Sequence, residues 1–131
     1  MTEEELKEYR KSPSWEKVFK NASNGCLHAF KTQRNFTIHF LIAFLVIVLA
    51  LWLKISFEKT LVLLLVIVFL LVVEMGNTAV ERTVDLITDK WSPKARIVKD
   101  LGAGMVLMAS LGAVVVGFLI LFPPLWQKLF G

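Results

Sequence analysis

Cysteine is almost absent from this chain of 131 residues, and charged residues make up only 20% of it. The single cysteine, Cys26, excludes an internal disulfide bond and a cluster of cysteines around a metal ion. The chain also lacks internal repeats and low-complexity tracts, and its polar, acidic start is unlike a cleavable signal peptide. Hydrophobic residues, by contrast, make up 56% of the chain. A soluble domain of this size cannot bury so much apolar surface, so we expect a single domain embedded in lipid.

Three apolar segments are candidates for membrane-spanning helices. The first covers residues 36–53 and the third covers residues 101–122. Each is close to or above the roughly 18–20 apolar residues that a helix needs to cross a bilayer. The second, residues 61–73, is too short unless the helix continues through the polar residues that follow, so we expect a helix over 61–87. Two prolines after residue 122 are expected to end the third helix.

Basic residues at the ends of these segments predict their orientation. The side holding the N-terminus and residues 82–100 carries most of them, whereas the opposite side has only Lys54, Lys59 and Lys128. The positive-inside rule then places the N-terminus in the cytoplasm and the C-terminus outside. The net charge is +4, and the basic residues that produce it flank the apolar segments. We therefore expect the partner to be a membrane and not a nucleic acid.

A surface helix is predicted over residues 12–32. Ser12 and Pro13 have the pattern of a helix cap followed by proline at the first helical position. Apolar side chains then recur at helical spacing, and Gly25 is expected to break the helix. This amphipathic stripe either lies on the cytoplasmic leaflet or covers the membrane helices; it consists of Trp15, Val18, Phe19, Ala22 and Cys26. Residues 1–11 are predicted to be a polar tail.

Four polar side chains follow the second apolar segment. Glu74, Asn77, Glu81 and Asp85 lie within roughly 80° of one another on a helix and form what we call the acidic stripe. For Asp85 alone, an ordinary solvated face explains the residue equally well. Burying an unpaired carboxylate such as Glu74 beside a membrane span is costly, so the stripe as a whole indicates function.

Carboxylates at this spacing suit a hard cation such as Mg²⁺, which in turn binds phosphates. Positive groups for phosphates lie nearby, at Lys94, Arg96 and Lys99. No Walker phosphate-binding pattern or protein-kinase signature is present, and the glycines at 102 and 104 are interpreted as helix-packing residues. The residues alone therefore predict either metal-assisted chemistry or ion translocation at the inner membrane face.

Three motifs together resemble the prokaryotic diacylglycerol kinase family. They are EMGNTAVERTVD at residues 74–85, AxxxKD at residues 95–100 and KTQRNFTIH at residues 31–39, and the similarity covers nearly the whole chain. The resemblance implies an all-α integral membrane fold, with an N-terminal amphipathic surface helix and three transmembrane helices per subunit, assembled as a homotrimer in the bacterial plasma membrane. It also implies a lipid kinase that uses ATP and Mg²⁺. FKTQRN at residues 30–35 looks like a segment common in undecaprenol kinases, which favours undecaprenol over diacylglycerol as the substrate.

The resemblance assigns a role to each polar position. Glu74 matches the catalytic base that activates the lipid hydroxyl, and Asn77 would orient the substrate or the γ-phosphate. Glu81 would hold the metal ion. Further positions of the nucleotide site are matched by Asp85, Lys99 and Asp100.

Gln33 departs from the family, which usually has a second metal-binding glutamate at this position. An amide oxygen also ligates Mg²⁺ but brings no negative charge. Either the site is naturally altered or the chain carries an engineered Glu→Gln change. The two histidines, His28 and His39, are interpreted as surface or packing residues.

Two other functions remain alternatives to the kinase. One is a catalytically weakened or non-enzymatic relative, which Gln33 favours; the other is a small ion-coupled transporter that uses the acidic stripe. Lys99 and Asp100 favour the kinase. A transporter is expected to bind no ATP, so nucleotide-dependent thermal stabilisation in detergent separates the two.

Replacing Gln33 by glutamate should improve the metal site, because Mg²⁺ prefers negatively charged oxygens. We expect Gln33→Glu to lower the Mg²⁺ concentration for half-maximal activity and to raise turnover by about tenfold or more, equivalent to about 1.4 kcal/mol in the barrier. A metal titration of both forms measures this. Superimposable curves would show that position 33 does not touch the metal.

Overall fold

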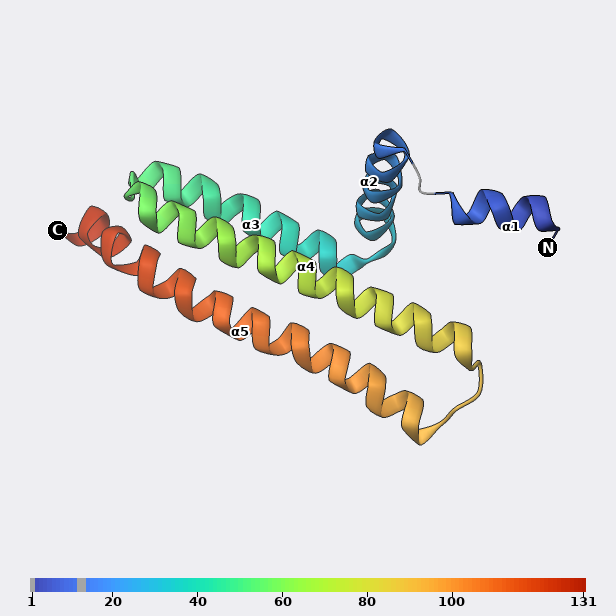
Figure 1. Ribbon diagram of the computed structural model, residues 1–131. Coiled ribbons are helices and arrows are strands. Elements are labelled where there is room, and N and C mark those ends of the chain that lie inside the picture. Colours follow the sequence, from blue (N-terminus) through green and yellow to red (C-terminus); the bar gives the residue numbers. More distant parts are fainter. Residues whose placement is uncertain (1, 12–13) are drawn as a thin grey trace.

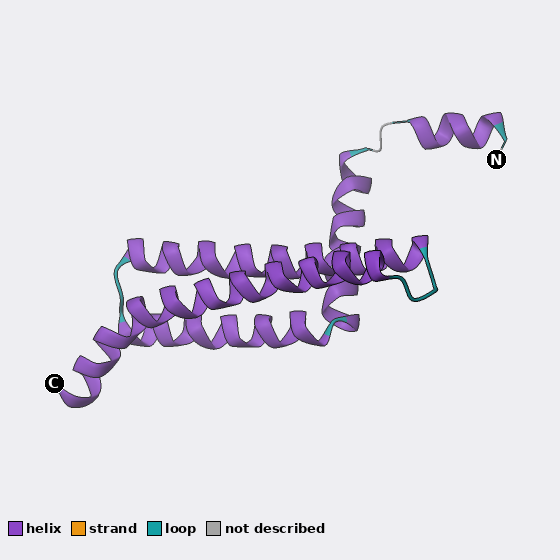
Figure 2. Ribbon diagram, turned by 90° about the horizontal axis from the view of Figure 1, so that it is seen from below, coloured by secondary structure: helices purple, strands orange, loops and turns teal. Residues whose placement is uncertain are grey.

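The structure, a computed structural model, describes residues 2–11 and 14–131, which are helical almost throughout. Three helices, α3, α4 and α5, lie side by side as a bundle (Figure 1). α2 is steeply inclined to the bundle at the start of α3, whereas α4 and α5 extend past it, and α1 lies apart from the bundle (Figures 1 and 2). The predicted all-α class is confirmed. The bounds are α1 (Glu3–Arg10), α2 (Trp15–Thr32), α3 (Arg34–Leu53), α4 (Phe57–Ile87) and α5 (Pro93–Phe130).

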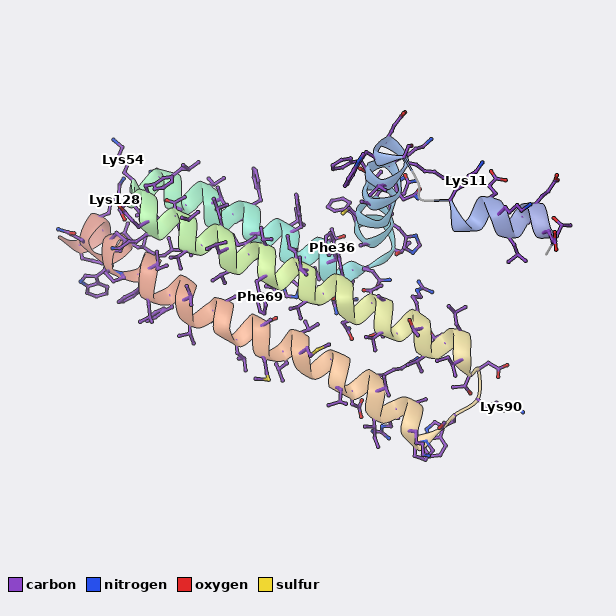
Figure 3. The ribbon with its side chains drawn as sticks, in the orientation of Figure 1. Lys11, Phe36, Lys54, Phe69, Lys90 and Lys128 are labelled. Atoms are coloured by element: carbon purple, nitrogen blue, oxygen red, sulfur yellow. The ribbon has the colours of Figure 1, made fainter. Side chains whose placement is uncertain are left out.

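α3, α4 and α5 are each long and apolar enough to cross a membrane, as predicted. Many of their large apolar side chains are exposed, among them Phe44, Phe69 and Met108. Such exposure is unfavourable in water but not in lipid, where the surroundings are as apolar as the side chain. Side chains project from the outer surfaces of the bundle along its length (Figure 3). The protein is therefore embedded in a membrane.

The two ends of the bundle are built differently. At one end α3 turns tightly into α4 through Lys54, which has a left-handed backbone with φ of 53°. Lys128 of α5 lies at the same end (Figure 3). Its Nζ donates a 2.9 Å hydrogen bond to the backbone carbonyl oxygen of Trp52 and lies 4.2 Å from the centroid of the Trp52 indole ring. The α4–α5 connection is at the other end, where Ser92 caps the first turn of α5.

A small protein core lies where the three helices meet near the α3–α4 turn. It consists of Ala50 and Leu53 of α3, Leu63 of α4 and Leu121 of α5. The polar part of α4, from Glu74 onward, lies toward the opposite end. The apolar core and the acidic stripe therefore occupy different parts of the bundle.

We predicted that the third membrane helix ends at residue 122. Instead, α5 continues through Pro123 and Pro124 to Phe130. Proline lacks an N–H group and crowds the preceding turn, and α5 changes direction near this point (Figures 1 and 2). Aromatic side chains one turn apart favour continuation: the ring centroids of Phe122 and Trp126 are 5.9 Å apart, and those of Trp126 and Phe130 are 4.6 Å apart. The third helix is also longer at its start, because it begins at Pro93 rather than residue 101.

The N-terminal region also differs from the prediction. The predicted start of the surface helix at Ser12 and Pro13 lies outside the described residues, and α2 begins at Trp15, after the N-cap Ser14. α2 continues through Gly25 without the expected break. Its apolar stripe is exposed, so the stripe does not cover this chain's own membrane helices. The helix α1 in the predicted polar tail was not expected; it is stabilised by a capping box between Thr2 and Glu5.

Candidate active site

Glu74 and Asn77 are the buried polar residues among those that the structure describes, with 3% and 9% of their surface exposed. Both lie on α4. Glu74 Oε2 and Asn77 Oδ1 are fully buried, and no described residue donates a hydrogen bond to either. Buried polar atoms nearly always have a partner, so two such atoms on residues one turn apart on α4 indicate a site that a ligand completes.

Asn77 is held between Glu81 and Gly102. Its Nδ2 donates a 3.2 Å hydrogen bond to Glu81 Oε1, one turn further along α4. Its Oδ1 lies against Gly102 of α5, where an added Cβ would collide with Oδ1 and come within 3.4 Å of Asn77 Cγ. Gly102, interpreted from sequence as a packing residue, therefore also leaves room for a polar group of the candidate site.

Asp85, Lys99 and Asp100 come together where α4 and α5 are connected. Lys99 Nζ donates a 2.6 Å hydrogen bond to Asp85 Oδ1 on the neighbouring helix, and Arg96 Nε lies 3.6 Å from Asp100 Oδ2. These residues line a pocket of about 690 Å³, which we call the polar pocket. Its charged and polar lining suits a ligand with phosphate groups. The rest of the lining is Val84, Thr88, Asp89, Lys90, Trp91, Ser92 and Ala95.

A second hollow of about 420 Å³ lies between α3, α4 and α5 within the apolar part of the bundle. We call it the apolar groove. Its lining on α4 runs from Leu63 to Leu71, so it ends one turn before Glu74. The polar members of its lining are His39 of α3 and Ser110 of α5. A groove with these walls suits a hydrocarbon chain.

The acidic stripe connects these two hollows along α4. Glu74 follows the last groove residue of this helix, Leu71, and Asp85 already lines the polar pocket. The two residues are 11 positions apart, which is about 16.5 Å along the axis of an α-helix. One helix therefore presents a buried carboxylate beside an apolar groove and charged groups beside a polar pocket.

Gln33 lies at the junction of α2 and α3, and its Nε2 donates a 3.4 Å hydrogen bond to Thr32 Oγ1. None of the hydrogen bonds of the described residues joins Gln33 to Glu81, the two residues predicted to bind metal. Within residues 2–11 and 14–131, no group of three or more His, Cys, Asp or Glu side chains is arranged to hold a metal ion. The metal site therefore remains a prediction from sequence.

His39 is the residue near the site that the sequence analysis assigned to packing. Its Nε2 lies 3.9 Å from Glu74 Oε2. The signal in the sequence was weak, because a single histidine in an apolar helix most often packs. Only the crossing of α3 and α4 shows that the two residues meet.

Comparison with known proteins identifies the family to which the chain is similar. A family model described as prokaryotic diacylglycerol kinase matches residues 20–121. The chain is 36% identical over 109 residues to the undecaprenol kinase of Bacillus subtilis (strain 168), covering 83% of this chain and 89% of that protein. It is 41% identical over 108 residues to the diacylglycerol kinase of Synechocystis sp. (strain ATCC 27184 / PCC 6803 / Kazusa), covering 82% of this chain but only 62% of that protein.

A membrane-embedded helical bundle with this site and these relatives is a lipid kinase. The chain belongs to the prokaryotic diacylglycerol kinase family, because the family model matches well over half of its length.

The contact between Gly102 and Asn77 predicts a loss of activity without a loss of stability. Gly102→Ala should displace the amide of Asn77, because Asn77 Oδ1 occupies the space into which the Cβ of alanine would project. A displaced side-chain tip is a small structural change, and alanine favours the helix by about 1 kcal/mol over glycine. We expect turnover to fall by about tenfold or more while the thermal midpoint in detergent is kept.

Gly104→Ala is the matched control, because a Cβ at Gly104 meets no atom within 4 Å. It should leave turnover close to that of the unmodified protein. Equal turnover of the two variants would contradict the role assigned to the Gly102–Asn77 contact.

Proposed function

We propose that this lipid kinase transfers the γ-phosphate of ATP to the hydroxyl group of undecaprenol or diacylglycerol, with Mg²⁺, at the cytoplasmic face of the membrane. The observation that carries the proposal is the buried carboxylate of Glu74, between the apolar groove and the polar pocket. A lipid alcohol has its hydroxyl at the boundary between hydrocarbon and polar surroundings, and Glu74 lies at that boundary of α4.

In this proposal Glu74 is the general base. Its carboxylate accepts the proton of the lipid hydroxyl as the hydroxyl oxygen attacks the γ-phosphorus, and the bond from that phosphorus to ADP breaks. Neither Glu74 Oε2 nor Asn77 Oδ1 accepts a hydrogen bond from a described residue, so the carboxylate and the amide keep capacity to accept hydrogen bonds when the site is occupied. Asn77 would orient the reacting groups.

Phosphate binding is assigned to the polar pocket. Lys99 and Arg96 are cations of its lining, and each contacts a carboxylate: Lys99 that of Asp85, and Arg96 that of Asp100. These side chains are about half exposed or more, so the ion pairs are weak enough for phosphates to displace them.

The side chains of the acidic stripe can offer a metal ion oxygen ligands, which Mg²⁺ prefers. This ion is usually bound by one or two carboxylates together with the phosphates of the substrate, and Glu81 supplies one carboxylate. Gln33 is proposed to supply an amide oxygen. When bound, the ion would neutralise part of the phosphate charge.

The lipid is proposed to be undecaprenol rather than diacylglycerol. The undecaprenol kinase relative is matched over 89% of its length, whereas the diacylglycerol kinase relative is matched over 62%. The apolar groove suits either lipid, so its shape does not discriminate between them.

The arrangement in the membrane is also a proposal. The positive-inside rule and the basic residues on that side support a cytoplasmic N-terminus and a cytoplasmic polar pocket. The exposed Trp15 and Phe19 of α2, 79% and 69% exposed, support a surface helix lying on the leaflet. The apolar groove is open on a single chain, and three helices can hardly enclose both a nucleotide and a lipid, so we propose a homotrimer.

The decisive assay offers radiolabelled ATP with undecaprenol and diacylglycerol side by side to the purified protein. We expect a labelled lipid phosphate, more from undecaprenol, and none when Mg²⁺ is chelated. Gln33 lacks the negative charge of the glutamate that is usual in the family at this position. The assay therefore includes Gln33→Glu. If neither form labels any lipid, the proposed reaction is wrong.

Substitutions of two carboxylates of the stripe are expected to impair different steps of the reaction. Glu74→Gln should abolish turnover and leave nucleotide affinity nearly unchanged, because the base acts on the lipid side of the transferred phosphate. Glu81→Gln should weaken the binding of Mg-ATP. Nucleotide affinity measured for both variants decides, and equal losses would show that the metal-binding carboxylate has been assigned incorrectly.

A further inference from the structure

The carboxylate of Glu74 has a neighbour that the proposed reaction does not yet use. His39 Nε2 lies 3.9 Å from Glu74 Oε2, and the two side chains are 21% and 4% exposed. Oε2 is the buried oxygen that accepts no hydrogen bond from a described residue. Among the described residues, this is the one ion-pair contact that Glu74 makes. The nearby Asn77 donates its side-chain hydrogen bond from Nδ2 to Glu81 Oε1 instead.

His39 also has a defined place relative to the apolar groove. It is the α3 residue of the lining that carries an ionisable side chain, and the other groove residues of this helix are Ile42, Ala43 and Val46. An imidazole that reaches from this wall toward the buried carboxylate on α4 occupies the end of the groove where a lipid hydroxyl must arrive.

We propose that His39 is a positioning residue for the general base. The N–H of Nε2 donates to Glu74 Oε2 and fixes the rotamer of the carboxylate, so that Oε1 is directed at the lipid hydroxyl. The present separation is longer than a hydrogen bond, as is common before a substrate is bound, and it shortens when the lipid closes the site. This inference rests on the proposed kinase reaction with Glu74 as its base.

A histidine that only packs would behave differently. A packing residue can be replaced by an apolar side chain of similar size with little effect on the chemical step. A positioning residue needs a donor at the end of the side chain, because a carboxylate that rotates freely spends less time in the reactive geometry. The two roles therefore separate in turnover rather than in stability.

The test compares three replacements of His39 in the full-length protein, with ATP and undecaprenol in detergent micelles. Phenylalanine keeps the ring but has no donor. Glutamine places an amide N–H close to the position of Nε2, whereas the shorter asparagine does not reach it. We expect His39→Phe and His39→Asn to lower kcat by about tenfold or more, with KM for ATP unchanged, and His39→Gln to recover most of the loss.

His28→Phe is the control, because His28 lies exposed on α2 and should leave kcat unchanged. The Gln and Asn variants are both polar, so their comparison holds even if phenylalanine disturbs folding. If His39→Phe has the kcat of the unmodified protein, or if glutamine and asparagine lower it equally, the positioning role is wrong while the kinase stands. A protein that phosphorylates no lipid even with histidine at position 39 removes the reaction and this inference together.

Discussion

The structure depends on the burial of one carboxylate in a bundle that lipid surrounds. Glu74 is 3% exposed, and an unpaired charge at such a position is among the most unfavourable features a membrane helix can carry. The two neighbouring helices each contact α4 near this residue. His39 of α3 lies beside Glu74. On the α5 side, the absence of a side chain at Gly102 leaves room for the amide of Asn77. A buried, unpaired carboxylate does not stabilise the fold, whereas the proposed reaction gives it a use as a proton acceptor at the edge of the hydrocarbon.

α4 connects two environments because it is longer than its apolar part. The helix covers Phe57–Ile87, and its first half lines the apolar groove while its last turns reach the polar pocket. A lipid alcohol and a charged nucleotide have no common solvent. An enzyme that joins them must therefore hold each in its own surroundings and bring only the reacting groups together. The acidic stripe lies on α4 between those two hollows.

Patterns along one helix could be predicted from the sequence, and contacts between helices could not. Hydrophobic length predicted the membrane helices, and spacing predicted that Glu74, Asn77 and Glu81 share a face; the hydrogen bond from Asn77 to Glu81 agrees with this. The contact of His39 with Glu74 joins residues 35 positions apart, so no local pattern reports it. The continuation of α5 beyond the prolines was missed because proline signals outweighed the aromatic side chains one turn apart from residue 118 to residue 130.

We propose that the reaction takes place at Glu74, between the two hollows. An experimental structure with a non-hydrolysable ATP analogue, Mg²⁺ and a lipid alcohol is the sharpest test of this location. We expect the lipid tail in the apolar groove, its hydroxyl within hydrogen-bond distance of the Glu74 carboxylate, and the phosphates between Glu81 and Lys99. A nucleotide bound away from the polar pocket, or a lipid hydroxyl far from Glu74, would contradict it.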